Sequence, residues 1–174
     1  MQVADLREQR CANKKDDMMQ GSEPVLKPDG RQSETALAIQ RGVARLLRDH
    51  NYAMLTEFTL ASGRRADIIG LSDEGQLWII EIKSSPGDYH ADGKWHEYRD
   101  FCDRFSFAIP QTMDRALIPD HAGLIVADQW GAEILQPASE HPLHASRRKA
   151  LTHSFARIAA QRLQLVWEGS PFVL

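Results

Sequence analysis

The sequence predicts a mixed α/β domain whose central sheet of about five strands is flanked by helices. Three observations support this prediction. Apolar residues recur at helical spacing over residues 37–47, and an apolar meander broken by turn residues follows over 52–83. A short apolar strand at 123–127 then precedes a second long helical segment at 147–163. Such elements bury their apolar faces when helices pack on a sheet.

The first helix is predicted to start at Ser33 and to end at residues 49–51. Its apolar stripe consists of Leu37, Ile39, Val43, Leu46 and Leu47. Another side carries Arg41, Arg45 and Arg48, either as a solvated face or as an edge that faces phosphates. Residues 52–60 then predict a strand that carries Glu57.

Residues 64–83 predict a β-hairpin with an acidic pair on one face. Turn residues at 72–75 separate two apolar runs. A turn centred on Glu74 places Asp67 opposite Glu81, and alternation puts Lys83 on the same face as Glu81. Because facing like charges destabilise a hairpin, a divalent cation is the expected compensation.

The loop at 61–63 leaves the position of Glu57 open. Closure by three residues puts Glu57 opposite Asp67, whereas closure by four puts Phe58 there. Glu57 is therefore either a third carboxylate or an exposed strand residue.

The second half of the chain alternates short elements. Residues 84–88 are predicted as a loop and 94–104 as a helix with Trp95, Tyr98 and Cys102 on its buried stripe. Two short strands follow at 105–109 and 123–127, and residues 132–135 are a candidate partner of the latter. The helix at 147–163 precedes an apolar tail, residues 166–174, which we expect to dock on the domain or to join two copies as a homodimer.

Composition indicates one soluble domain. The chain has 174 residues and a net charge of -3, so any nucleic-acid site depends on local basic patches. Residues 1–30 are polar and predict a mobile extension, which leaves 31–174 as the domain. The two cysteines lack metal-ligand spacing, and neither a signal peptide nor a membrane span is indicated, so a cytoplasmic location is expected.

Asp67 and Glu81 can supply oxygen ligands to Mg²⁺ or Mn²⁺, which bind few carboxylates and fill their remaining positions with water and phosphate. The carbonyl of Ile82 is a further candidate ligand. Lys83 can position or deprotonate a water, or stabilise negative charge. Arg64, Arg65 and Lys94 are candidate phosphate contacts, with Arg65 expected to face Lys83.

These residues resemble the PD-(D/E)XK nuclease superfamily, through Ala66-Asp67 and Glu81-Ile82-Lys83 after a leading helix. The pattern is most similar to the MmcB-type bacterial DNA-repair putative endonucleases over roughly residues 35–135. The resemblance implies a restriction-endonuclease-like core with Asp67 and Glu81 as metal ligands and Lys83 as the catalytic lysine. Resolvase-like members also place a metal-binding glutamate on the first helix, where this chain has only Glu34, and Glu57 is the preferred substitute.

The leading hypothesis is a Mg²⁺-dependent DNA endonuclease that acts in repair. The alternative is a nuclease-fold module that binds DNA or another repair protein without cutting it.

Overall fold

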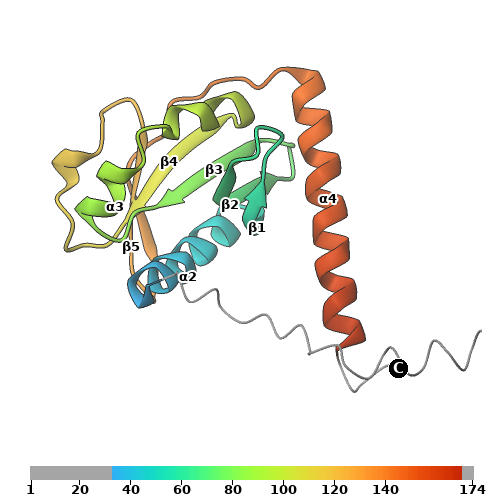
Figure 1. The fold of residues 1–174 in the computed structure, drawn as a ribbon, viewed down its shortest axis with the longest axis horizontal. Helices are drawn as coiled ribbons and strands as arrows, with labels where there is room; N and C mark the ends of the chain where they lie inside the picture. Colours follow the sequence, from blue (N-terminus) through green and yellow to red (C-terminus); the bar gives the residue numbers. More distant parts are fainter. Residues whose placement is uncertain (1–32, 170–174) are drawn as a thin grey trace, which may run out of the picture. The chain divides into compact units, whose positions relative to one another are not determined.

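The computed structural model describes residues 33–169. The predicted N-terminal extension at 1–30 lies outside these residues, as does the end of the apolar tail at 170–174. The described part contains a mixed sheet with helices on both faces, so the predicted fold class is confirmed (Figure 1).

The sheet has six strands in chain order, one more than the sequence predicts. Its strands are β1 (Tyr52–Thr59), β2 (Arg65–Ser72), β3 (Leu77–Ile82), β4 (Arg104–Ile109), β5 (Gly123–Ala127) and β6 (Ala132–Gln136). Strands β3, β4 and β5 are parallel to one another, and the remaining neighbours are antiparallel. The additional strand is β6, which the apolar segment at 132–136 forms by pairing with β5.

One face of the sheet is covered by α2 (Glu34–Asp49). The helix begins where predicted, because the hydroxyl of Ser33 accepts a hydrogen bond from the Ala36 N–H at 3.1 Å. Its stripe packs against alternate residues of the sheet, among them Ile68, Ile80 and Ile82. Residues 67, 81 and 83 alternate with these three positions, so their side chains belong to the opposite face.

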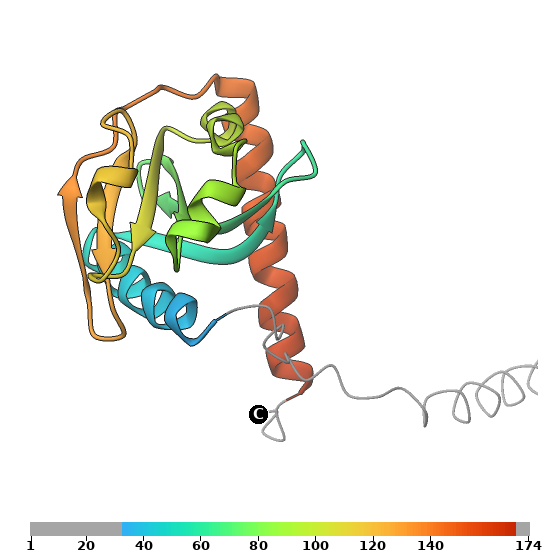
Figure 2. The ribbon, with the colours of Figure 1, turned by 60° about the vertical axis from the view of Figure 1, so that its left-hand side comes forward.

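That opposite face is covered by α3 (Pro86–Ala91), the 3₁₀ helices η1 (Trp95–Phe101) and η2 (Arg115–Leu117), and α4 (Ala145–Glu168). Aromatic side chains dominate its core, and Phe105 stacks between Trp95 and Tyr98. The long helix α4 lies beside β1, where Arg162 donates to the Thr56 carbonyl at 2.8 Å (Figures 1 and 2).

Three predicted elements differ from the structure. Residues 86–91 form α3 instead of a loop, because Ser85 caps the helix by accepting from the Asp88 N–H and Pro86 favours its first turn. The helix predicted at 94–104 is a 3₁₀ helix that ends at Phe101. The prediction that the tail docks on the domain is wrong for residues 166–168, which extend α4 with Val166 and Trp167 exposed.

No helix within residues 33–169 is long and apolar enough to cross a membrane.

Candidate active site

The β2–β3 hairpin brings Asp67 and Glu81 together as the predicted register requires. Ile69 pairs with Ile79 and Leu71 with Leu77. Beyond these pairs, side chains replace the backbone ladder: the Ile82 N–H donates to Oδ2 of Asp67 at 2.9 Å, and the Asp67 N–H donates to Oε1 of Glu81 at 3.1 Å. Each carboxylate therefore reaches across to the other strand, which fixes both at the end of the hairpin.

Burial makes this acidic pair costly to ionise. Glu81 is 4% exposed and Asp67 is half-buried. Desolvation raises the pKa of Asp67 to about 6, and desolvation together with the charge of Asp67 raises the pKa of Glu81 to about 8. Lys83 lowers both pKa values, without cancelling the effect of burial. The site is thus short of positive charge, which a divalent cation would supply.

Lys83 follows β3 directly and is held at both ends. Its backbone N–H donates to the Ala108 carbonyl at 2.9 Å, which continues the pairing of β3 with β4. Its ammonium lies 2.8 Å from Oδ2 of Asp92 and 3.8 Å from Oε2 of Glu81. Burial alone would lower the pKa of Lys83, but the hydrogen bond to Asp92 and the charge of Glu81 raise it, so the group stays charged.

Asp92 is the site residue that sequence reasoning missed. It follows α3 and accepts from Lys83, and its other oxygen lies 3.8 Å from Nη1 of Arg64. The hydrogen bond to Lys83 and the charges of Lys83 and Arg64 lower the pKa of Asp92 against the opposing effect of burial. The sequence does contain a signal for this contact. Ser85 and Pro86 are typical of a helix start, and a short helix there brings Asp92 back towards the end of β3.

Glu57 lies opposite Asp67, which is one of the two predicted alternatives, and its backbone is in a strained conformation. The hairpin loop has three residues, since Leu60 donates to the Arg64 carbonyl, and the pairs Thr56–Ile68 and Phe58–Ala66 bracket Glu57 opposite Asp67. Glu57 has a φ of 51°, in the left-handed region. Its carboxylate contacts Nε of Arg65 at 2.5 Å. Its charge still raises the pKa of Asp67, although less than burial does.

This site offers few side chains that could hold a metal ion. Within residues 33–169, no group of three or more His, Cys, Asp or Glu residues is placed to hold a metal ion together. Asp67 and Glu81 nevertheless fit a Mg²⁺ ion, which commonly takes one or two carboxylates and completes its shell with water and phosphate. Burial raises the pKa of both carboxyl groups, so a nearby cation would favour their charged forms.

Glu34 does not join this pair. It lies exposed at the start of α2, and α2 packs on the other face of the sheet.

The three candidate DNA contacts differ in their accessibility. Arg64 is engaged internally: its Nε contacts Oε2 of Glu97 at 2.7 Å, and its guanidinium lies 5.2 Å from the ring centroid of Tyr98. Arg65 pairs with Glu57 rather than facing Lys83, yet its side chain remains 57% exposed. Lys94 is exposed just before η1.

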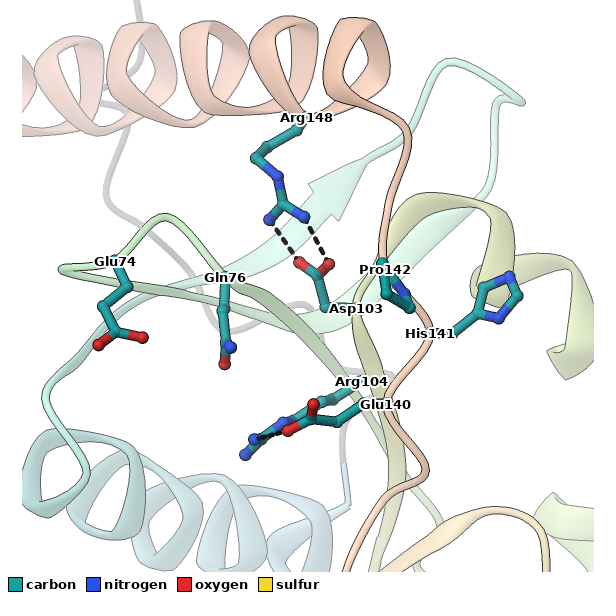
Figure 3. Close-up of a pocket in the computed structure, with 8 residues that line it drawn as sticks. All are labelled: Glu74, Gln76, Asp103, Arg104, Glu140, His141, Pro142 and Arg148. Carbon is teal, nitrogen blue, oxygen red and sulfur yellow. Dashed lines mark hydrogen bonds and ion pairs between the residues drawn. The ribbon is translucent and has the colours of Figure 1, made fainter.

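A pocket of about 220 Å³ lies near the other end of the hairpin, where Glu74 and Gln76 line it (Figure 3). Asp103 in this pocket accepts from Nη1 and Nη2 of Arg148 at 2.7 and 2.6 Å, and from the N–H groups of Leu77 and Leu143. Such complete pairing indicates a structural tie between β3, β4 and α4 rather than a second reaction centre.

The chain is similar to known proteins in sequence and in structure. The family model described as DNA repair protein MmcB-like matches residues 23–169. The solved structure of SPO1766, a protein of unknown function from Silicibacter pomeroyi, is 40% identical, with a TM-score of 0.76, and the match covers 82% of this chain and 99% of that chain. A repair endonuclease from Pyrococcus abyssi is 12% identical, with a TM-score of 0.33 over 53% of this chain and 43% of that chain. No curated protein matches the chain.

Proposed function

Because the chain belongs to the MmcB-like DNA repair protein family, we propose that it is a metal-dependent endonuclease that hydrolyses phosphodiester bonds of DNA. The observation that carries this proposal is the pair Asp67 and Glu81, two carboxylates held together across a hairpin beside the charged Lys83. A pair of facing acids costs stability. Such a cost is typical of a site shaped for a ligand rather than for folding.

Asp67 and Glu81 would hold Mg²⁺ or Mn²⁺, with the carbonyl of Ile82 and the carboxylate of Glu57 as further candidate ligands. When bound, the ion supplies Lewis-acid polarisation of a phosphoryl oxygen and lowers the pKa of water. For Glu57 to take part, it would have to share its carboxylate with Arg65, whose Nε contacts Oε2 at 2.5 Å.

Lys83 would act on the phosphate through its charge. Its ammonium is hydrogen-bonded to Asp92, and its pKa is raised, so the neutral form needed to accept a proton is scarce near pH 7. We therefore favour charge stabilisation and orientation of the attacking water over general-base catalysis. Asp92 would act through Lys83, as a positioning residue.

Arg65 and Lys94 would contact the DNA backbone on either side of this centre. Both are exposed, and both belong to segments next to the acidic pair, at the start of β2 and before η1. Arg64 would contribute mainly by orienting Asp92 and Glu97, which it already contacts.

The direct test is incubation of the full chain with Mg²⁺ or Mn²⁺ and a panel of single-stranded, nicked, forked and crosslinked DNA. We expect cleavage of at least one substrate, its loss in Asp67→Asn and Lys83→Ala, and its retention in Lys149→Ala. Lys149 is the matched control because it is an exposed lysine on α4.

Equal cleavage by Lys83→Ala and the parent chain would refute the assignment of Lys83. Salt-sensitive DNA binding that survives Asp67→Asn, with no cleavage of any substrate, would instead identify a module that binds DNA without cutting it.

A further inference from the structure

An exposed tryptophan stands at the turn between β5 and β6. Trp130 is 75% exposed, whereas Trp78 in the core is 2% exposed. The aromatic face of this exposed side chain is available to stack on a ligand.

The turn that carries Trp130 is held firmly. Oδ1 of Asp128 accepts from the N–H groups of Trp130 at 2.7 Å and Gly131 at 3.0 Å, and the Asp128 N–H donates to the Gly131 carbonyl. Arg45 of α2 donates to the carbonyl of Gln129. At Gly42, an added Cβ would lie 2.3 Å from the carbonyl oxygens of Asp128 and Gly131, so α2 packs directly on this turn. Because this turn is rigid, binding a ligand to the indole of Trp130 would cost little backbone conformational entropy.

The turn lies at the same edge of the sheet as the acidic pair. Strands β3, β4 and β5 are parallel, and the register places Ile82 beside Ala108 and Ala108 beside Ile125. Ala127, which ends β5, is therefore level with the residue after Lys83. Two strand spacings, about 10 Å, separate β5 from β3. A short run of nucleotides can span this separation.

The surroundings of Trp130 suit a nucleic acid. A hollow of about 420 Å³ beside it is lined by Gln111 and Arg115 as well as by Glu133. Arg45 lies beside the turn, and the carboxylate of Asp128 is already engaged by two backbone N–H groups. The hollow thus offers a flat aromatic face, an amide and a guanidinium, which are the groups that stack on and hydrogen-bond to bases.

We infer that Trp130 is a stacking platform for an unpaired base of the DNA whose backbone is bound at Asp67 and Glu81. This inference rests on the proposed function and narrows its substrate to DNA with a single-stranded segment close to the scissile phosphate. The reason is geometric: in an intact duplex the face of each base is covered by its neighbours, and an indole can stack only on an exposed face.

The test measures binding without cleavage, in the full chain carrying Asp67→Asn and without metal. Fluorescence anisotropy of labelled single-stranded and blunt duplex DNA is measured at low salt for that chain and for chains that add Trp130→Ala, Trp130→Phe or Trp167→Ala. Trp167 is the matched control because it is 68% exposed on α4. We expect Trp130→Ala to weaken single-strand binding about 5- to 100-fold. Trp130→Phe should keep most of the affinity, Trp167→Ala all of it, and duplex binding should not change.

The other outcomes overturn the inference in distinguishable ways. DNA binding that is indifferent to Trp130→Ala removes the platform and leaves the proposed function intact. An equal loss on duplex DNA would mean a backbone contact and not stacking. A change in the sedimentation of the chain with no effect on DNA would assign Trp130 to a protein interface. No single-strand binding by any variant would also overturn the inference, whereas the proposed function is decided separately by the cleavage assay with metal.

Discussion

Lys83 and Asp92 form an ion pair at 2.8 Å in which the lysine side chain is 5% exposed and the aspartate side chain 18%. The same ammonium lies 3.8 Å from Glu81. Asp92 therefore holds the ammonium of Lys83 beside the acidic pair, at a longer distance from Glu81 than from Asp92. This geometry links α3, whose end carries Asp92, to the acidic pair at the end of β3.

Replacement of Asp92 should change how Lys83 works without removing it. Asp92→Asn removes the strongest influence that keeps the pKa of Lys83 raised, so that pKa falls. We expect cleavage to drop about 10-fold or more and its alkaline limb to shift to lower pH, because the neutral lysine forms earlier.

The measurement is a pH–rate profile of DNA cleavage for Asp92→Asn beside the parent chain. Asp100→Asn is the matched control, since this aspartate is 75% exposed and its contact with Arg147 is 3.9 Å long. A profile for Asp92→Asn that superimposes on that of the parent would remove the positioning role.

The acidic pair should make the protein less stable as the pH rises. The pKa values of Asp67 and Glu81 in the folded chain lie above their ordinary values near 4, so the folded chain binds more protons than the unfolded chain between about pH 4 and pH 8. The free energy of unfolding therefore falls with increasing pH across this range, and each of the two carboxyl groups contributes a loss on the order of 1 kcal/mol or more.

Glu81→Gln tests this dependence because the amide mimics the protonated acid and can still accept from the Asp67 N–H. We expect its Tm to exceed that of the parent at pH 8 by several degrees and to differ little at pH 5. Thermal unfolding at both values is the measurement, with the exposed Glu74→Gln as control. A gain at pH 8 no larger than that at pH 5 would contradict the raised pKa of Glu81.

A bound divalent cation should offset the loss of stability that ionised Asp67 and Glu81 cause. Ions that bind only the folded chain stabilise it by about 2.7 kcal/mol at a concentration of 100 Kd, and carboxylates that hold protons must release them. We therefore expect Mn²⁺ to raise the Tm at pH 8 and binding to release protons, as measured by calorimetry in buffers of different ionisation enthalpy. Asp67→Asn should abolish both effects, and Asp73→Asn, an exposed position in the hairpin turn, should preserve them. An identical response of the two variants would place the ion elsewhere.

The core of the site was predictable because it depends on local rules. A turn at 72–75 and the period of two along a strand fix which residues of a hairpin face each other, and Asp67 and Glu81 follow from that register. For the loop at 61–63, the sequence allowed two alternatives, closure by three or by four residues. The structure has the three-residue loop, which places Glu57 opposite Asp67.

The remainder depended on side-chain choices that no local pattern specifies. Lys83 and Asp92 are separated by α3, and their contact required a helix where the composition of 84–88 indicated a loop. The strand register would allow Arg65 to face Lys83. Instead, Arg65 forms an ion pair with the carboxylate of Glu57, whose backbone is left-handed. Electrostatic pairing among several nearby charges is decided by a few tenths of an ångström, which a sequence does not contain.

Gly42 offers a last prediction, in which the usual rule for helices reverses. Alanine normally stabilises a helix interior by about 1 kcal/mol relative to glycine. At Gly42, however, the added Cβ would lie 2.3 Å from two backbone carbonyl oxygens of the β5–β6 turn, so either α2 or the turn must move. We expect Gly42→Ala to lower the free energy of unfolding by about 1–3 kcal/mol, as measured by urea denaturation.

Gly87→Ala is the control, because Gly87 lies in α3 and its Cβ would approach no atom closer than 3.9 Å. This variant should be as stable as the parent or slightly more so. If Gly42→Ala were also neutral, the packing of α2 on the turn would be too loose to hold Trp130 in place, and the rigid presentation of that side chain would lose its support.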